Sequence, residues 1–109
     1  MAKHQFGIME TPPQKGVRYD EFETEKYACI DVDDDFIELL CPMLMEIPTY
    51  YHTLDKLDYN LAYCGITLIP PQSSSAISEI IAGNIDLQSL KILLDKAVKE
   101  NKFVIHYGL

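Results

Sequence analysis

The stretch that decides the fold reads N-L-A-Y-C-G-I-T-L-I over residues 60–69. Its alternate positions give two apolar faces, one formed by Ala62, Cys64, Ile66 and Leu68 and the other by Leu61, Tyr63, Thr67 and Ile69. A strand with one polar face covers a core on one side only, whereas a strand that is apolar on both faces is covered on both sides. The stretch therefore predicts an inner strand of a sheet, which Pro70 and Pro71 bring to an end.

The segments around this strand carry helix and strand patterns in a regular order. In chain order, the expected elements are strand 27–32, helix 33–44, strands 49–54 and 60–69 joined by turn 55–59, helices 73–82 and 86–102, and strand 103–107. Pro42 should shorten or kink the first helix. Asp35 and Glu38 have the spacing of a capping box there, while the serines at 73–75 and Asp86 are expected to cap the next two helices.

This order is the split βαβ plan (βαββαβ) of a ferredoxin-like fold, a two-layer α+β sandwich with a mainly antiparallel sheet. Residues 26–109 form this single domain. Residues 1–25 carry Pro12, Pro13 and Gly16 without a regular period, which predicts an N-terminal arm or extended lead-in with room for a short strand at 5–9. The plan places strands 27–32 and 60–69 at the centre and strands 49–54 and 103–107 at opposite edges, and it leaves one sheet face open.

The composition of the 109 residues is that of a globular domain, with 48% hydrophobic residues and a formal net charge of −8. This acidity argues against nucleic acid as a partner, because binding it needs basic groups that displace counterions from the phosphates. No apolar run reaches the length of a secretory signal or a membrane helix, which predicts a cytoplasmic protein without membrane contact. The three cysteines form no Cys-x-x-Cys pair and are expected to be reduced.

The negative charge is concentrated in residues 20–35, which contain eight acidic residues and one basic residue. The acidic interaction surface that we expect comprises Asp20, Glu21, Glu23, Glu25, Asp33, Asp34 and Asp35. A calcium loop counted from Asp31 is excluded, because Phe36 stands where glycine is needed and Pro42 where glutamate is needed. A field of one sign speeds association with a partner of opposite charge. The pattern predicts a protein-protein interaction or regulatory module, of inhibitor or immunity type, with a basic partner; a face that only keeps the chain in solution is the simpler alternative.

A second hypothesis is a small-molecule-binding domain or small enzyme that acts as a homodimer through the open sheet face. Its pocket would involve His52, Asp55, Tyr51 and Tyr63, because a neutral imidazole can act as a base or a ligand. The expected strand order places His52 and His106 roughly 14 Å apart, too far to share a metal ion. No catalytic residue, metal or cofactor is therefore assigned. A third hypothesis, a subunit of a larger assembly, rests on the arm, which could become ordered on a partner.

Overall fold

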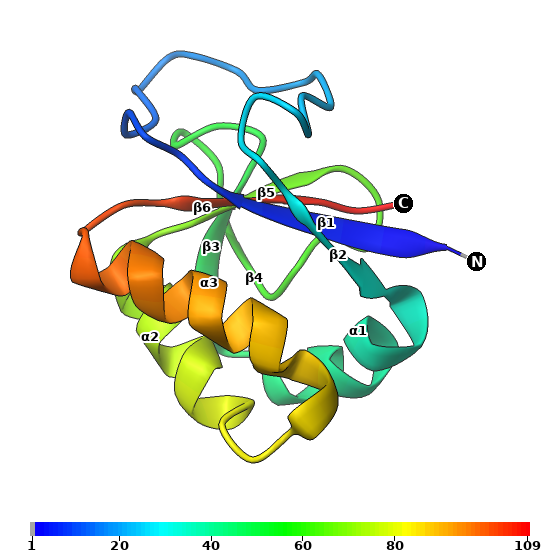
Figure 1. The fold of residues 1–109 in the computed structure, drawn as a ribbon. Coiled ribbons are helices and arrows are strands. Elements are labelled where there is room, and N and C mark those ends of the chain that lie inside the picture. Colours follow the sequence, from blue (N-terminus) through cyan, green and yellow to red (C-terminus); the bar gives the residue numbers. More distant parts are fainter. Residues whose placement is uncertain (1) are drawn as a thin grey trace.

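One six-stranded antiparallel sheet organises the chain, of which the computed structural model describes residues 2–109 (Figure 1). The strands are β1 (Lys3–Ile8), β2 (Ile30–Asp33), β3 (Pro48–Tyr51), β4 (Leu57–Tyr59), β5 (Ile66–Ile69) and β6 (Val104–Tyr107). The helices are α1 (Asp34–Leu40), α2 (Pro71–Ile80) and α3 (Gln88–Lys99), together with the short 3₁₀ helices η1 (Cys41–Met43) and η2 (Ile85–Leu87). The α+β class with an antiparallel sheet is thus confirmed, and the helices lie on one side of the sheet (Figure 1).

The strand order β2-β1-β6-β5-β3-β4 differs from the predicted ferredoxin-like order. β6, expected at an edge, lies between β1 and β5, and all of its residues are buried. The cause is β1, which comes from the stretch predicted as a lead-in and pairs antiparallel with both β2 and β6. β4 forms from the predicted hairpin turn and becomes the edge beyond β3. β5 is an inner strand, as predicted, but only over Ile66–Ile69.

Prolines set two helix boundaries. α1 ends at Leu40 and the chain continues as η1, which contains Pro42, so the predicted shortening of this helix is confirmed. Pro71 occupies the first turn of α2, where its missing N–H has no helical acceptor to lose. Pro70 and Pro71 therefore end the strand and begin the helix within two residues.

The side-chain caps differ from the predictions. Asp33 is the N-cap of α1 but its side chain makes no capping hydrogen bond. Ser73 lies inside α2 and its hydroxyl donates to the Pro48 carbonyl, so it joins the helix to β3 rather than capping it. Asn84, not Asp86, caps the helical segment that precedes α3, by accepting from the Asp86 N–H at 2.9 Å. Of the three predicted caps, only the one before α3 is replaced by a neighbouring side chain, and α1 and α2 begin without a side-chain cap.

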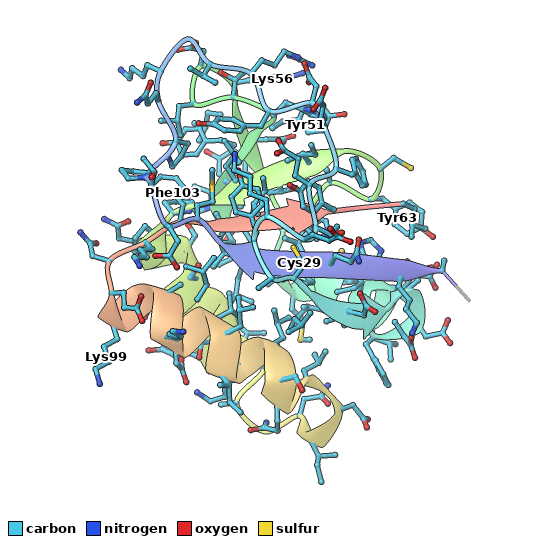
Figure 2. All side chains as sticks on the ribbon, turned by 45° about the horizontal axis from the view of Figure 1, so that its top comes forward. Cys29, Tyr51, Lys56, Tyr63, Lys99 and Phe103 are labelled. Atoms are coloured by element: carbon cyan, nitrogen blue, oxygen red, sulfur yellow. The ribbon has the colours of Figure 1, made fainter. Side chains whose placement is uncertain are left out.

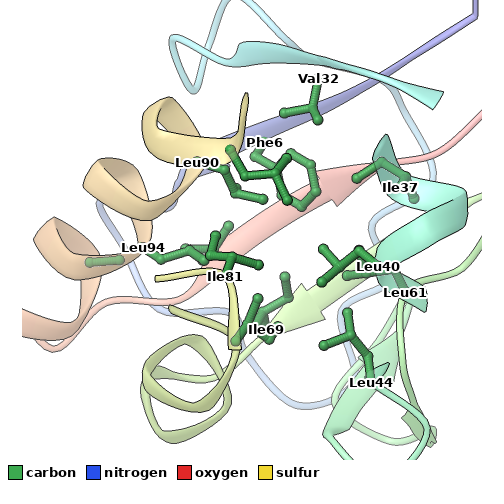
Figure 3. Close-up of a cluster of buried hydrophobic side chains, with 14 residues drawn as sticks. Phe6, Val32, Ile37, Leu40, Leu44, Leu61, Ile69, Ile81, Leu90 and Leu94 are labelled. Atoms are coloured by element: carbon green, nitrogen blue, oxygen red, sulfur yellow. The ribbon is translucent and has the colours of Figure 1, made fainter. Parts of the chain in front are cut away.

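The larger core lies between the helices and one face of the sheet (Figure 3). Its buried members are Phe6, Val32, Ile37, Leu40, Leu44, Leu61, Ile69, Ile77, Ile81, Leu87, Leu90, Leu94, Ala97 and Val104. Leu90, Leu94 and Ala97 recur at helical spacing on α3 and are fully buried, whereas Ile92 on the same helix is 69% exposed. The period of the apolar residues in α3 therefore predicted correctly which face packs against the sheet.

Leu94→Ala is expected to lower the free energy of unfolding by about 2–5 kcal/mol, because it removes buried methyl groups from a packed core. Ile92→Ala is the matched control on the same helix and should change stability by less than about 0.5 kcal/mol. Urea denaturation of both variants measures the difference. Equal losses in the two variants would contradict the assignment of the buried face.

Residues 9–29 cover the face of the sheet opposite the helices (Figure 1). The buried cluster there consists of Met9, Ile66, Leu68, Ile105 and Tyr107, with Tyr19, Tyr27, Cys29, Tyr50, Leu54 and Phe103 packed against it. The ring centroid of Phe22 lies 4.8 Å from that of Tyr107. The expectation of an open sheet face, on which the homodimer hypothesis rested, was wrong, because the chain covers this face with its own residues.

Candidate functional site

Two buried histidines from opposite ends of the chain meet inside the sheet. His4 on β1 and His106 on β6 are both 0% exposed. His4 Nδ1 lies 2.8 Å from His106 Nε2, and the two imidazole rings stack with centroids 5.1 Å apart. The sequence analysis missed this pair, since it placed His106 at a sheet edge and assigned His4 no role.

The pair belongs to a chain of hydrogen bonds that reaches the surface. His4 Nε2 lies 2.8 Å from Asp34 Oδ1, and the Tyr63 hydroxyl donates to Asp34 Oδ2 at 2.8 Å. At the inner end, His106 Nδ1 lies 3.2 Å from the Thr67 hydroxyl. We refer to His4, His106, Asp34, Tyr63 and Thr67 as the histidine relay. It joins β1, β5 and β6 to the first residue of α1 and to the segment before β5.

When both histidines are neutral, one arrangement of their protons gives every N–H and O–H donor of the relay an acceptor. The Asp34 carboxylate only accepts, so His4 carries its proton on Nε2 and offers the Nδ1 lone pair to His106. His106 then donates from Nε2, and its Nδ1 accepts from the Thr67 hydroxyl. The Thr67 oxygen in turn accepts from the Ala62 N–H at 2.9 Å. The hydrogen bonds therefore run in one direction, from Thr67 through both histidines to Asp34.

Burial and neighbouring groups set the protonation states of the relay. Burial, followed by the neighbouring His4, lowers the pKa of His106 from 6.5 to about 3. The hydrogen bond from His4 lowers the pKa of Asp34 below its ordinary value, and the hydrogen bond to Asp34 raises the pKa of Tyr63 to about 12. Near neutral pH, Asp34 is ionised, His106 is neutral, and Tyr63 keeps its proton. The hydrogen bonds of the relay therefore hold Asp34 and Tyr63 in place.

Two of the residues predicted around His52 form hydrogen bonds with the segment that covers the sheet. His52 Nε2 accepts from the Ile66 N–H at 3.2 Å, so Nδ1 carries the proton and points at the Tyr19 carbonyl, 2.8 Å away, and at Asp20, 2.9 Å away. Asp55 accepts from the Gly16 N–H at 3.0 Å. Both ring nitrogens of His52 are therefore occupied within the chain.

Tyr51 and Tyr63, which the same hypothesis grouped together, belong to different sets. Tyr51 packs edge-on against His52, with ring centroids 4.4 Å apart, and lies under the Lys56 ammonium. Tyr63 contacts His4 and Asp34 instead. Figure 2 shows Tyr51 and Tyr63 at separate places on the molecule. The structure brings Tyr51, His52 and Asp55 into one loop region and leaves Tyr63 to the histidine relay.

The predicted acidic surface is divided between the two sides of the sheet. Asp20, Glu21, Glu23 and Glu25 are exposed and lie in the segment that covers the face opposite the helices. Two of these carboxylates have cationic neighbours, since Asp20 pairs with Arg18 and Glu23 pairs with Lys26. Asp34 and Asp35 begin α1, on the side of the helices, whereas Asp33 is the last residue of β2. The expected acidic surface therefore draws its residues from the segment that covers the sheet, from the end of β2 and from the start of α1.

A longer acidic region surrounds α1. No lysine or arginine occurs in residues 27–55, which build β2, α1, η1 and β3. Its exposed carboxylates are those of Asp31, Asp35, Glu38, Glu46 and Asp55, and Asp33 and Asp34 are half-buried. Lys3 is the register partner of Asp33 across the pair of β1 and β2. α1 and η1 contain no lysine or arginine, and their side chains are acidic or apolar.

A shallow open groove of about 570 Å³ lies in this region, between the α1–η1 segment and the chain before β5. Its lining residues are Glu38, Cys41, Pro42, Met45, Asn60, Leu61 and Tyr63. Met45 is 66% exposed and Tyr63 is 46% exposed, so two large side chains of the lining face solvent. We call this hollow the Tyr63 groove. It was not predicted, because its two walls are about twenty residues apart in the sequence.

Hydrogen bonds hold both walls of the Tyr63 groove. The Asn60 side-chain amide donates to the Cys41 carbonyl at 2.8 Å, and its oxygen accepts from the Leu61 N–H at 2.7 Å. The Asn60 carbonyl accepts from the Thr49 hydroxyl at 2.8 Å. Asn60 therefore ties η1 to the opposite wall, and the histidine relay holds Tyr63 from behind. The groove is a formed feature of the fold.

Comparison of the chain with models of protein families, with curated proteins and with solved structures finds no match. Among residues 2–109, no three His, Cys, Asp or Glu side chains gather closely enough to hold a metal ion. No helix within the same residues has the length and apolar character needed to cross a membrane. The function is therefore argued from the geometry of the site.

Proposed function

We propose that this protein is a cytoplasmic interaction or regulatory module, of inhibitor or immunity type, that binds a basic protein partner through the surface of α1, η1 and the adjoining strands. The observation that carries the proposal is the absence of lysine and arginine from residues 27–55, combined with exposed carboxylates around exposed apolar side chains. A field of one sign attracts a partner of opposite charge and repels anionic ones.

The apolar residues on the same surface separate this proposal from a merely solvated acidic face. Leu39 on α1, Met43 on η1 and Met45 just after η1 are each more than half exposed. Exposed apolar side chains that gather on one region indicate contact with another molecule, whereas scattered ones need no explanation. Protein interfaces combine such an apolar centre with a charged rim. The alternative of a small-molecule site at His52 has less support, because both ring nitrogens are bound within the chain.

The proposal is tested by capturing proteins from an extract of the native cells on the immobilised full chain. We expect the wild type to retain a basic protein at low salt and to release it as ionic strength rises, because exposed charges are screened. The triple variant Asp35→Asn, Glu38→Gln, Glu46→Gln should lose at least about tenfold in affinity for it, which corresponds to about 1.4 kcal/mol.

The matched control is Glu21→Gln, Glu23→Gln, Glu25→Gln, which removes the same charge from the other side of the sheet. This control should bind like the wild type apart from the small loss that follows any change in net charge. Equal losses in the two triple variants would show that net charge, and not the surface of α1, determines binding. Retention of no basic protein at low salt would contradict the proposal itself.

A further inference from the structure

We propose that the Tyr63 groove is the anchor pocket of this module and that it takes one apolar side chain of the partner, of leucine or methionine size, next to a lysine or arginine. This inference rests on the proposed function and adds the place and the chemistry of recognition. The occupant follows from three features of the groove: its apolar lining, its acidic lining residue Glu38, and the hydrogen-bonded support of Tyr63.

The apolar lining fits a side chain better than a polar ligand. Pro42, Met45 and Leu61 supply aliphatic and thioether surface, and Tyr63 supplies an aromatic ring. A volume of about 570 Å³ holds a large side chain with part of its backbone. Methionine adapts its shape to an incoming group, because its side chain is unbranched and polarisable. Met45 is 66% exposed, so a group that covers it removes apolar surface from contact with water, which favours binding.

The charge around the groove requires the flanking residue to be a cation. Glu38 lines the groove and is exposed, and Asp34 lies behind the Tyr63 hydroxyl with its pKa lowered. Every charged residue of α1 and η1 is acidic. A lysine or arginine beside the apolar anchor meets the Glu38 carboxylate, whereas an aspartate or glutamate in that place is repelled.

The same charges disfavour a second copy of this chain as the occupant. A symmetric pair would place Glu38 and its acidic neighbours against the same residues of the other copy. Like charges that face each other across an interface lower its stability. The groove is therefore better matched to a different, basic protein than to itself.

Tyr63 is held before any partner arrives. Its hydroxyl donates to Asp34, which is fixed by His4, which is fixed in turn by the buried His106. A side chain that is already ordered loses little rotational freedom on binding, so its contacts contribute more fully to affinity. Tyrosines in such positions are common among the residues that dominate binding energy at interfaces. The relay thus holds the Tyr63 side chain in place on one wall of the groove, while the Met45 side chain on the other wall can adapt its shape.

The experiment is an NMR titration of the full chain labelled with ¹⁵N and with ¹³C at the methionine methyl groups. The probes are N-acetyl-Leu-Arg amide and N-acetyl-Leu-Glu amide, which differ in the charge beside the anchor. We expect a saturable shift of the Met45 methyl signal with the Leu-Arg probe, and binding of the Leu-Glu probe that is weaker by at least about fivefold. The Met9 methyl, which is buried, and the Met43 methyl, which does not line the groove, are internal controls.

Two variants test the role of charge. Glu38→Gln should reduce the preference for the Leu-Arg probe by at least about threefold while the Met45 methyl still responds to both probes. Glu79→Gln, an exposed change on α2, is the matched control and should leave the preference unchanged. Equal preferences in these two variants, or an equal response of wild-type Met45 to both probes, would overturn the inference.

The outcomes also separate this inference from the proposed function. If Met45 stays unshifted while the Leu-Arg probe moves the amide signals of residues 20–25, the anchor pocket is wrong but binding of a basic partner elsewhere stands. If Met45 responds as expected while the native extract yields no basic protein, the recognition chemistry of the groove is supported and the proposed module function fails.

Discussion

His106→Leu is expected to lower the free energy of unfolding by about 2–4 kcal/mol at pH 7, although leucine fits the buried site and adds apolar surface. The loss comes from the partners of His106. The Thr67 hydroxyl loses its acceptor and the lone pair of His4 Nδ1 loses its donor, both in a region without solvent. Each buried polar group left without a partner costs about 1–3 kcal/mol.

The same variant should have a weaker dependence of stability on pH. The pKa of His106 is lowered from 6.5 to about 3 in the folded protein, so the unfolded chain binds one more proton between these values. The stability from burying a neutral imidazole is fully present above pH 6.5 and is lost as the pH falls toward 3, at about 1.4 kcal/mol per pH unit. His106→Leu removes this group, so the stability gap between wild type and variant should narrow as the pH falls.

Urea denaturation at pH 7, 6 and 5 measures this gap. Within this range the depressed carboxylates, Asp34, Asp95 and Glu100, contribute little, because their ordinary pKa values lie lower. The stability that these carboxylates contribute is fully present above their ordinary pKa values. It is lost as the pH falls through their lowered pKa values in the folded protein, in the wild type and in the variant alike. A constant gap from pH 7 to pH 5 would show that burial of neutral His106 does not govern the acid response.

Gly108→Ala is expected to destabilise the fold by about 3 kcal/mol and to lower the melting temperature by about 10 °C. A Cβ at position 108 would lie 2.7 Å from the Ala62 carbonyl oxygen and 2.9 Å from the Tyr63 carbonyl carbon, and it would also meet the Tyr63 carbonyl oxygen. All three atoms are backbone, so no side-chain rotation relieves the contact. The Gly108 N–H also donates to the Gly65 carbonyl at 2.8 Å, which holds the two segments together.

The backbone displacement that Gly108→Ala causes should also change the Tyr63 groove. The segment at positions 62 and 63 must move away from the C-terminal strand to admit the methyl group, and it carries the Tyr63 ring with it. Gly83→Ala is the matched control, because nothing lies within 4 Å of the position its Cβ would occupy. Thermal denaturation of both variants, with the Met45 methyl signal as a local probe, measures the two effects. Stability of Gly108→Ala within about 0.5 kcal/mol of the wild type would contradict the close packing of these segments.

Elements defined by near neighbours in the chain were predicted well. The apolar positions of α3, the break at Pro42 and the two apolar faces of residues 66–69 were all visible in the sequence, because helix and strand periods involve residues a few positions apart. The strand order was not visible. β1 spans six residues, but one of its inward positions holds His4 rather than an apolar residue, so the stretch lacked the alternation that would have indicated an inner strand.

The candidate site was predicted in part. The eight acidic residues and one basic residue of the stretch 20–35 can be counted in the sequence, and they led to the proposal of a basic partner. The histidine relay was missed because His4 and His106 are 102 positions apart, and only the pairing of β1 with β6 brings them together. A sequence signal existed in the two histidines that sit among apolar residues on strand-like segments. Nothing in the sequence indicated that each was the partner of the other.

The sequence by itself determined the acidic balance, the face of α3 that packs inward, the inner position of β5 and the end of α1. These properties depend on the chemistry and spacing of neighbouring residues. The tertiary structure adds that residues 3–8 enter the sheet, that residues 9–29 cover its second face, and that the Tyr63 hydroxyl donates to Asp34 beside an open groove. Such features depend on which distant segments pair and pack together to bury apolar surface while giving most buried polar groups a partner.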